Sequence, residues 1–187
     1  GFLNASFRKA SHGSEARQTR LLGLWEQGRP PDGSANGQWL APADFGYGRE
    51  LTTREIDALL ADIGSGPDEA AAYRRLGYLI DEEGNLSQER HGHQVLDIAA
   101  GLVPPDTLRA SAKPARDDAA SAAALLFVDV PEPGPEDSTG AAADAYLLDG
   151  LHYILRRAGP QARVIVNISV GALAGSHDGH SLIEQAI

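Results

Sequence analysis

The chain has 187 residues, 42% of them hydrophobic, which is enough for one domain with a buried core. Its net charge is −10 and its basic residues never occur in runs longer than two, which excludes nucleic acid as the main partner because phosphate binding needs clustered positive charge. It has no cysteine, which excludes disulfides and thiolate sites, and no apolar run of about eighteen residues that could span a membrane.

Both ends of the sequence look interrupted. The chain opens on Gly1 and contains no methionine, and its last residues, SLIEQAI (181–187), read as a helix without a stop signal. We therefore expect a piece of a longer protein. No signal peptide is visible, and the sequence leaves open whether the protein is secreted or cytoplasmic.

The first half of the chain predicts a strand and two helices. TTREIDALLADI (52–63) has apolar residues at helical spacing and a cap at Thr52 or Thr53. In chain order, we expect an irregular polar start at 1–18, a strand at 19–28 and a long loop rich in Gly, Pro and aromatic residues at 28–50. The two helices follow, one at 52–63 and one in the stretch after Pro67.

The second half predicts a helix at 91–102, then a strand, a helix and a strand at 123–131, 141–158 and 162–171. The first helix is apolar nearly all round, which predicts that it is buried. The inward face of the helix at 141–158 is expected at Ala141, Ala145, Leu148, Leu151 (or His152) and Leu155. Continuous apolar strands suit a sheet covered on both faces, and strand, helix and strand in this order form a right-handed βαβ unit. The fold class is therefore α/β with a mostly parallel sheet.

His91 is the first candidate functional residue. It stands in the first turn of the predicted buried helix, and a rigid mounting suits a general base because proton transfer depends on hydrogen-bond geometry. Gly92 lacks a Cβ and lets a substrate or another backbone approach closely. The alternative is that His91 only caps the helix.

A second candidate lies where the strand at 162–171 ends. Ligands bind beyond the carboxyl ends of strands in open parallel sheets, which singles out Ser169, Val170 and Gly171. A strand end of this kind can also pair with an extended peptide. The alternative is an ordinary exit from strand to loop.

Two stretches together resemble a known family. HGHQVLDIAAG (91–101) is similar to the histidine segment of subtilisin-like serine peptidases, usually written H-G-T-H-V-A-G, and VIVNISVGA (164–172) is similar to their V-I-N-M-S-L-G-G segment, which lines the substrate cleft. The order of the elements between them also matches. LVPPDTLRA (102–110) resembles the family's V-A-P-x-A-x-L piece. GFLNASF (1–7) resembles the residues just after the catalytic aspartate, whose D-x-G segment would end at about Gly1.

The resemblance implies a three-layer α/β fold with helices on both faces of the sheet, incomplete here, with residues 1–187 forming part of one domain. TRLLGLWEQG and FGYGRELTTREIDALL resemble an insert of some family branches, expected at about 28–88. The implied activity is hydrolysis of a protein or peptide substrate by a Ser-His-Asp triad with His91 as general base. The aspartate would precede Gly1 and the serine would come after the second segment. We therefore expect the 187-residue piece alone to be inactive.

The resemblance also implies a substrate cleft. Ser169, Val170 and Gly171 would form one side of the pocket for the residue before the scissile bond, and Ser138, Thr139 and Gly140 the opposite rim. No cofactor is implied. Calcium sites occur in the family, but no acidic loop here has a recognisable ligand spacing.

The histidine segment departs from the family pattern at three positions. His93 replaces the threonine, Gln94 replaces the second histidine, and Asp97 replaces a small residue. His93 and Asp97 are four residues apart, so the two side chains could pair on one helix face. These departures keep a non-catalytic peptide-binding module open as an alternative function.

A hydrolase with a metal site is the second alternative. His91, His93, His177, Asp178 and His180 could supply ligands for zinc. Residues two apart on a helix diverge by about 200°, however, so His91 and His93 could not share an ion. Three acidic residues have no context that singles them out as partners of His91 and are expected to be solvated or capping carboxylates: Asp44, Glu50 and Asp129. Trp25 and Trp39 are expected to be packing aromatics.

Overall fold

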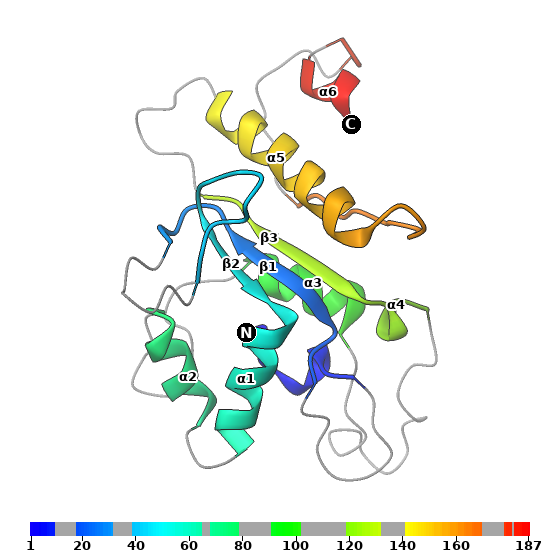
Figure 1. The fold of residues 1–187 in the computed structure, drawn as a ribbon. Helices are drawn as coiled ribbons and strands as arrows, with labels where there is room; N and C mark the ends of the chain where they lie inside the picture. The colour runs from blue at the N-terminus through cyan, green and yellow to red at the C-terminus, as the bar shows by residue number, and fades with distance from the viewer. Residues whose placement is uncertain are drawn as a thin grey trace. The chain divides into compact units, whose positions relative to one another are not determined.

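The computed structural model describes residues 1–9, 18–31, 39–64, 68–78, 91–101, 119–131, 141–169, 178–180 and 182–187 (Figure 1). The helices in this part of the chain are η1 (Ala5–Phe7), α1 (Thr53–Gly64), α2 (Glu69–Arg75), α3 (His91–Ala100), α4 (Ala119–Ala122), α5 (Ala141–Ala158) and α6 (Leu182–Ala186). The strands are β1 (Leu21–Glu26), β2 (Arg49–Thr52) and β3 (Leu125–Asp129). The prediction of a chain that mixes helices with a β-sheet is confirmed, but the described sheet is mixed and not mostly parallel.

The strands form one mixed sheet in the order β2-β1-β3. The amide of Leu125 donates to the carbonyl of Arg20, and the amide of Gln27 donates to that of Asp129, so β1 and β3 run parallel. Figure 1 shows β2 running in the opposite direction to β1. The strands predicted at 19–28 and 123–131 are therefore present. Residues 162–169 do not join the sheet, and 170–171 lie outside the described residues.

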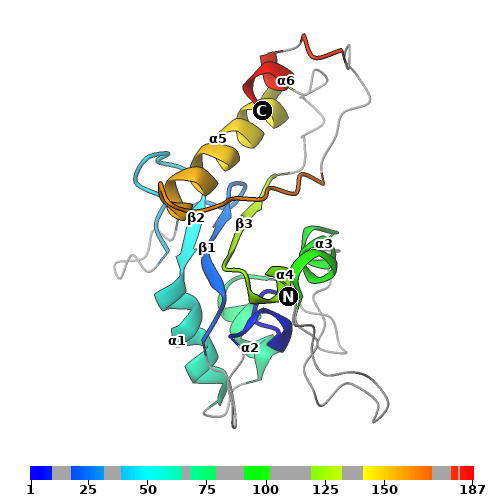
Figure 2. The ribbon, with the colours of Figure 1, turned by 90° about the vertical axis from the view of Figure 1, so that its right-hand side faces the viewer.

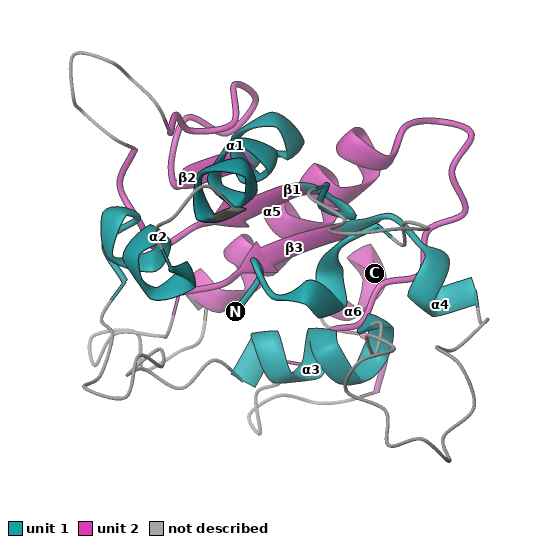
Figure 3. Cartoon of the chain, turned by 90° about the horizontal axis from the view of Figure 1, so that it is seen from below, with its two compact units in different colours: residues 1–22, 52–125 teal, residues 23–51, 126–187 magenta. Residues whose placement is uncertain are grey.

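The chain divides into two compact units, each built from two separate stretches (Figure 3). Unit 1 comprises Gly1–Leu22 and Thr52–Leu125, and unit 2 comprises Gly23–Leu51 and Leu126–Ile187. Each unit has its own buried aromatic and aliphatic side chains. Trp25 and Trp39 are both buried in unit 2, as expected of packing residues.

Unit 1 begins with a buried segment where an irregular polar start was expected. Phe2, Leu3 and Phe7 are all buried, and Asn4 caps η1 by accepting a hydrogen bond from the Ser6 amide at 3.0 Å. The polar residues between the apolar ones hid this pattern, because so short a helix has no full apolar period.

Helix α1 is confirmed with the expected cap. Glu55 accepts hydrogen bonds from both the amide and the hydroxyl of Thr52 at 2.7 Å, which is the carboxylate half of a capping box. The hydroxyl of Thr53 donates to the carbonyl of Leu21 at 2.9 Å and so joins the helix start to β1. The helix buries Ile56, Leu59 and Leu60 and contacts α2.

Helix α3 begins at His91 as predicted, but it is not buried. None of its side chains is buried within the described part of the chain, and Ile98 is 78% exposed. Helix α3 contacts η1 and α4 on one side, as Figure 2 shows. The apolar residues on its other side are therefore left in solvent in this structure.

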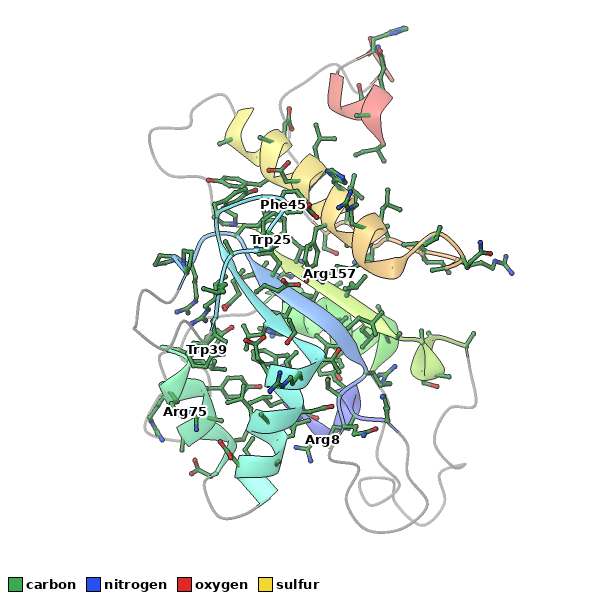
Figure 4. All side chains as sticks on the ribbon, in the orientation of Figure 1. Arg8, Trp25, Trp39, Phe45, Arg75 and Arg157 are labelled. Carbon is green, nitrogen blue, oxygen red and sulfur yellow. The ribbon has the colours of Figure 1, made fainter. Side chains whose placement is uncertain are left out.

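Helix α5 spans the predicted range in unit 2, but a different face packs inward. Tyr153 and Gly150 are buried, whereas Leu155 and Ala145 are exposed. Trp25 and Phe45 lie against this helix (Figure 4), and the Trp25 ring is 5.2 Å from that of Tyr153. Gly23 in β1 leaves the space that the Tyr153 hydroxyl occupies. Aromatic contacts thus replaced the aliphatic face expected from periodicity.

Strand β2 falls at the end of the predicted long loop and was missed because it carries charged residues. Arg49 pairs with the buried carboxylate of Glu26, and its guanidinium lies 5.6 Å from the Trp39 ring centre. Buried charges need such partners.

Among the described helices, none has both the length and the apolar character needed to cross a membrane.

Candidate functional site

The first turn of α3 carries the main candidate, His91. The helix begins at this residue, and its side chain is exposed, so the imidazole is accessible. The flanking Gly92 is half-buried. A general base must reach the proton it removes, and an exposed ring at a helix start meets that requirement.

His93 lies against the start of the chain. Its ring is half-buried and stacks on Phe2 with 6.1 Å between ring centres and an interplanar angle of 27°. Phe2 in turn meets Tyr73 edge to face at 5.4 Å. The contact joins two stretches far apart in the sequence, the segment at 1–7 and the histidine segment. His91 and His93 have different surroundings, as their spacing predicts.

The start of the chain is held in place by polar contacts as well. The amide of Leu3 donates to the Tyr73 hydroxyl at 2.8 Å, and the guanidinium of Arg8 donates to the Leu3 carbonyl at 3.0 and 3.2 Å. Burial raises the pKa of Tyr73, and the neighbouring carboxylate of Glu69 raises it further. These contacts fix the segment that resembles the one after the family's catalytic aspartate.

Asp97 is exposed on α3, and its carboxylate lies close enough to Gly1 to interact with it electrostatically. Position 97 of the histidine segment therefore lies near the segment at 1–7.

Of the residues expected to line a cleft, the structure describes Ser169 alone. It is exposed in unit 2, and its hydroxyl accepts a hydrogen bond from the Asn167 side chain at 2.8 Å. The others lie outside the described residues: Ser138, Thr139, Gly140, Val170 and Gly171.

The described residues do not form a metal site. They contain no group of three His, Asp or Glu side chains that could hold an ion, and His177 lies outside them. The amide of His180 donates to the Asp178 carboxylate at 3.1 Å, a local turn contact.

Glu50 corrects an expectation from the sequence. It was expected to be a solvated or capping carboxylate, but its side chain is buried in unit 2. It accepts a hydrogen bond from the Tyr153 hydroxyl at 2.8 Å and pairs with Arg157. Asp44 is exposed and pairs with Arg156, as expected of a surface carboxylate.

Sequence reasoning also missed Arg20, which is buried in unit 1 and donates to four backbone carbonyls. The available signal was its place at the start of an apolar strand, where an arginine side chain must either point into solvent or have hydrogen-bond partners.

No protein-family model, curated protein or solved structure matches this chain. The motifs and the geometry around α3 therefore carry the functional argument. That geometry offers an exposed imidazole, His91, at the start of a helix whose His93 packs on the N-terminal segment.

Proposed function

We propose that this chain is part of a subtilisin-like serine endopeptidase in which His91 is the general base. The observation that carries the proposal is the stacking of Phe2 on His93. This contact brings the segment that resembles the one following the family's aspartate against the segment that resembles its histidine motif. Two separate motif resemblances thus meet in one place within unit 1.

The proposed mechanism uses the family order of the triad. A serine C-terminal to the 164–172 segment attacks the peptide carbonyl while His91 takes its hydroxyl proton, and His91 then returns that proton to the leaving amine. An aspartate one or two residues before Gly1 orients the imidazole. Three residues span at most about 11 Å, which limits how far an aspartate two residues before Gly1 lies from Phe2, the residue that packs on His93.

The same proposal predicts the finer fold. Residues 162–169 come after β3 and α5, where a βαβ unit brings its second parallel strand. Ile165 is 97% exposed, and Val166 and Ile168 are also exposed. Burying such side chains stabilises a fold by roughly 1.5–3 kcal/mol each. In the whole domain this segment is a strand of a three-layer, mostly parallel sheet, and it lines the substrate cleft.

The departures at positions 93, 94 and 97 favour a second candidate, a subtilisin-like module that binds peptides without cleaving them. His93 packs on Phe2 and Asp97 lies near Gly1, so both replacements change the contact between α3 and the segment that would follow the family's aspartate. The two candidate functions differ in whether a serine reacts covalently: it does in an endopeptidase, and it does not in a binding module.

The test uses the whole gene product. A fluorophosphonate probe should label it, and His91→Ala should abolish labelling and cleavage of an unfolded protein, because no other group takes the serine proton. His152→Ala is the matched control, since this exposed histidine lies in unit 2 and contacts Phe45 at 5.5 Å. It should keep full activity. A parent protein that is neither labelled nor active but binds unfolded peptides would establish the binding module instead.

A further inference from the structure

Arg20 connects four separate backbone positions within unit 1. One terminal nitrogen of its guanidinium donates to the carbonyls of Ala120 and Ala123, both at 3.2 Å. The other donates to the carbonyl of Ser6 at 2.8 Å and to that of Ala100. The side chain is therefore attached at once to η1, to the last residue of α3 and to α4 with the turn after it.

The contact uses both arms of the arginine fork. Each terminal nitrogen donates to two carbonyls, whereas a lysine offers three N–H groups from one nitrogen. Arg20 is 5% exposed, and burial lowers its pKa. Four carbonyls face its terminal nitrogens, while its Nε has no hydrogen-bond partner among the described residues. The carbonyl of Ala100 is one of the groups that a helix leaves unpaired at its end, where a cation is also favoured by the helix dipole.

Two of the three elements joined by Arg20, α3 and η1, are the ones that matter for the candidate site. Helix α3 carries His91 at its first turn, and η1 comes directly after the segment that packs on His93. The position of α3 against η1 decides where the His91 imidazole lies relative to residues that precede Gly1. The buried Arg20 guanidinium donates to a carbonyl in each of them.

We propose that Arg20 is a positioning residue that locks α3 to η1 and so sets the alignment of His91 for proton transfer. The catalytic half of this proposal rests on the proposed function. The structural half does not, because the coupling of α3 to η1 exists whether or not the protein is an enzyme.

The experiment compares Arg20→Met and Arg20→Lys with Arg75→Met in the whole gene product. Arg75 is a matched control because it lies in unit 1 but is exposed, with a 2.9 Å ion pair to Asp62. Amide hydrogen exchange should be about tenfold faster in α3 and η1 of Arg20→Met, with α1 unchanged. Arg20→Lys should fall between, and Arg75→Met should leave α3 unchanged.

The same variants are then labelled with the fluorophosphonate. Arg20→Met should lower the maximal labelling rate about tenfold or more while leaving the apparent affinity for the probe unchanged, because misalignment acts on the chemical step. Arg20→Lys should restore part of the rate. A loosened α3 with an unchanged labelling rate would overturn the positioning role.

Two further outcomes are decisive. Unchanged exchange in α3, equal acceleration in all elements, or loss of cooperative folding in both Arg20 variants would show that Arg20 does not act locally on α3. An unlabelled wild-type protein would remove the proposed function, whereas the exchange data would still decide whether Arg20 locks α3 to η1.

Discussion

Tyr73, Tyr153 and Tyr47 each use the hydroxyl group in a hydrogen bond. Tyr73 accepts from Leu3, Tyr153 donates to Glu50, and Tyr47 donates to Asp149 at 2.8 Å. Burial is the main cause that raises the pKa of each, and a neighbouring carboxylate adds to it. Each therefore keeps its proton in the folded state at a pH where the unfolded chain has lost it.

This difference predicts how stability depends on pH. Unfolded tyrosines ionise near their ordinary value of about 10, so the three groups stabilise the fold fully below that pH and lose their contribution as pH rises above it. The urea midpoint should stay constant from about pH 7 to 9 and fall above about pH 10. Tyr153→Phe should weaken this fall, whereas Tyr146→Phe should not. A midpoint unchanged to about pH 11.5 would contradict the assignment.

Single residues were predicted well where local pattern decides and poorly where distant partners decide. The start of a helix at His91 and the cap at Thr52 depend on neighbours in sequence. The burial of Glu50 and Arg20 depends on Arg157, Tyr153 and four distant carbonyls, which no local pattern shows. The only sign of this burial in the sequence was a charged residue next to apolar ones.

Helix α2 anchors the start of the chain through Tyr73, and removing the hydroxyl oxygen of this residue tests the anchor. Tyr73→Phe removes the acceptor of the buried Leu3 amide, which should lower the free energy of unfolding by about 1–3 kcal/mol. Tyr146→Phe is the control, because its half-buried ring contacts Tyr47 without a hydrogen bond to the hydroxyl among the described residues. It should change stability by less than about 0.5 kcal/mol in urea unfolding. Equal stability of the two variants would refute the anchor.

The type of element was easier to predict than the face it buries. Helices α3 and α5 and strands β1 and β3 lie within the predicted ranges, and α1 ends one residue beyond its predicted range, at Gly64. The inward face of α5 was misassigned because Tyr153 and Gly150 pack through ring and backbone contacts, which aliphatic periodicity does not record. Helix α3 is apolar all round, so its sequence carries no information on which side faces a neighbour.

For the whole molecule, the proposed fold makes residues 164–169 a strand. Their amides should exchange rapidly in the 187-residue piece, where the segment has no strand partner in the structure, and slowly in the whole gene product. Strand β3 should be protected in both, which controls for global unfolding. Equally fast exchange of 164–169 in the whole product would exclude the subtilisin-like sheet.

The position of the fluorophosphonate adduct decides whether His91 serves a serine outside residues 1–187. His91 is proposed to serve a serine C-terminal to this segment, so peptide mapping of the labelled whole product should locate the adduct there. The adduct should be absent from His91→Ala, and the 187-residue piece alone should remain unlabelled. An adduct on a serine within residues 1–187, or one that persists in His91→Ala, would contradict the account.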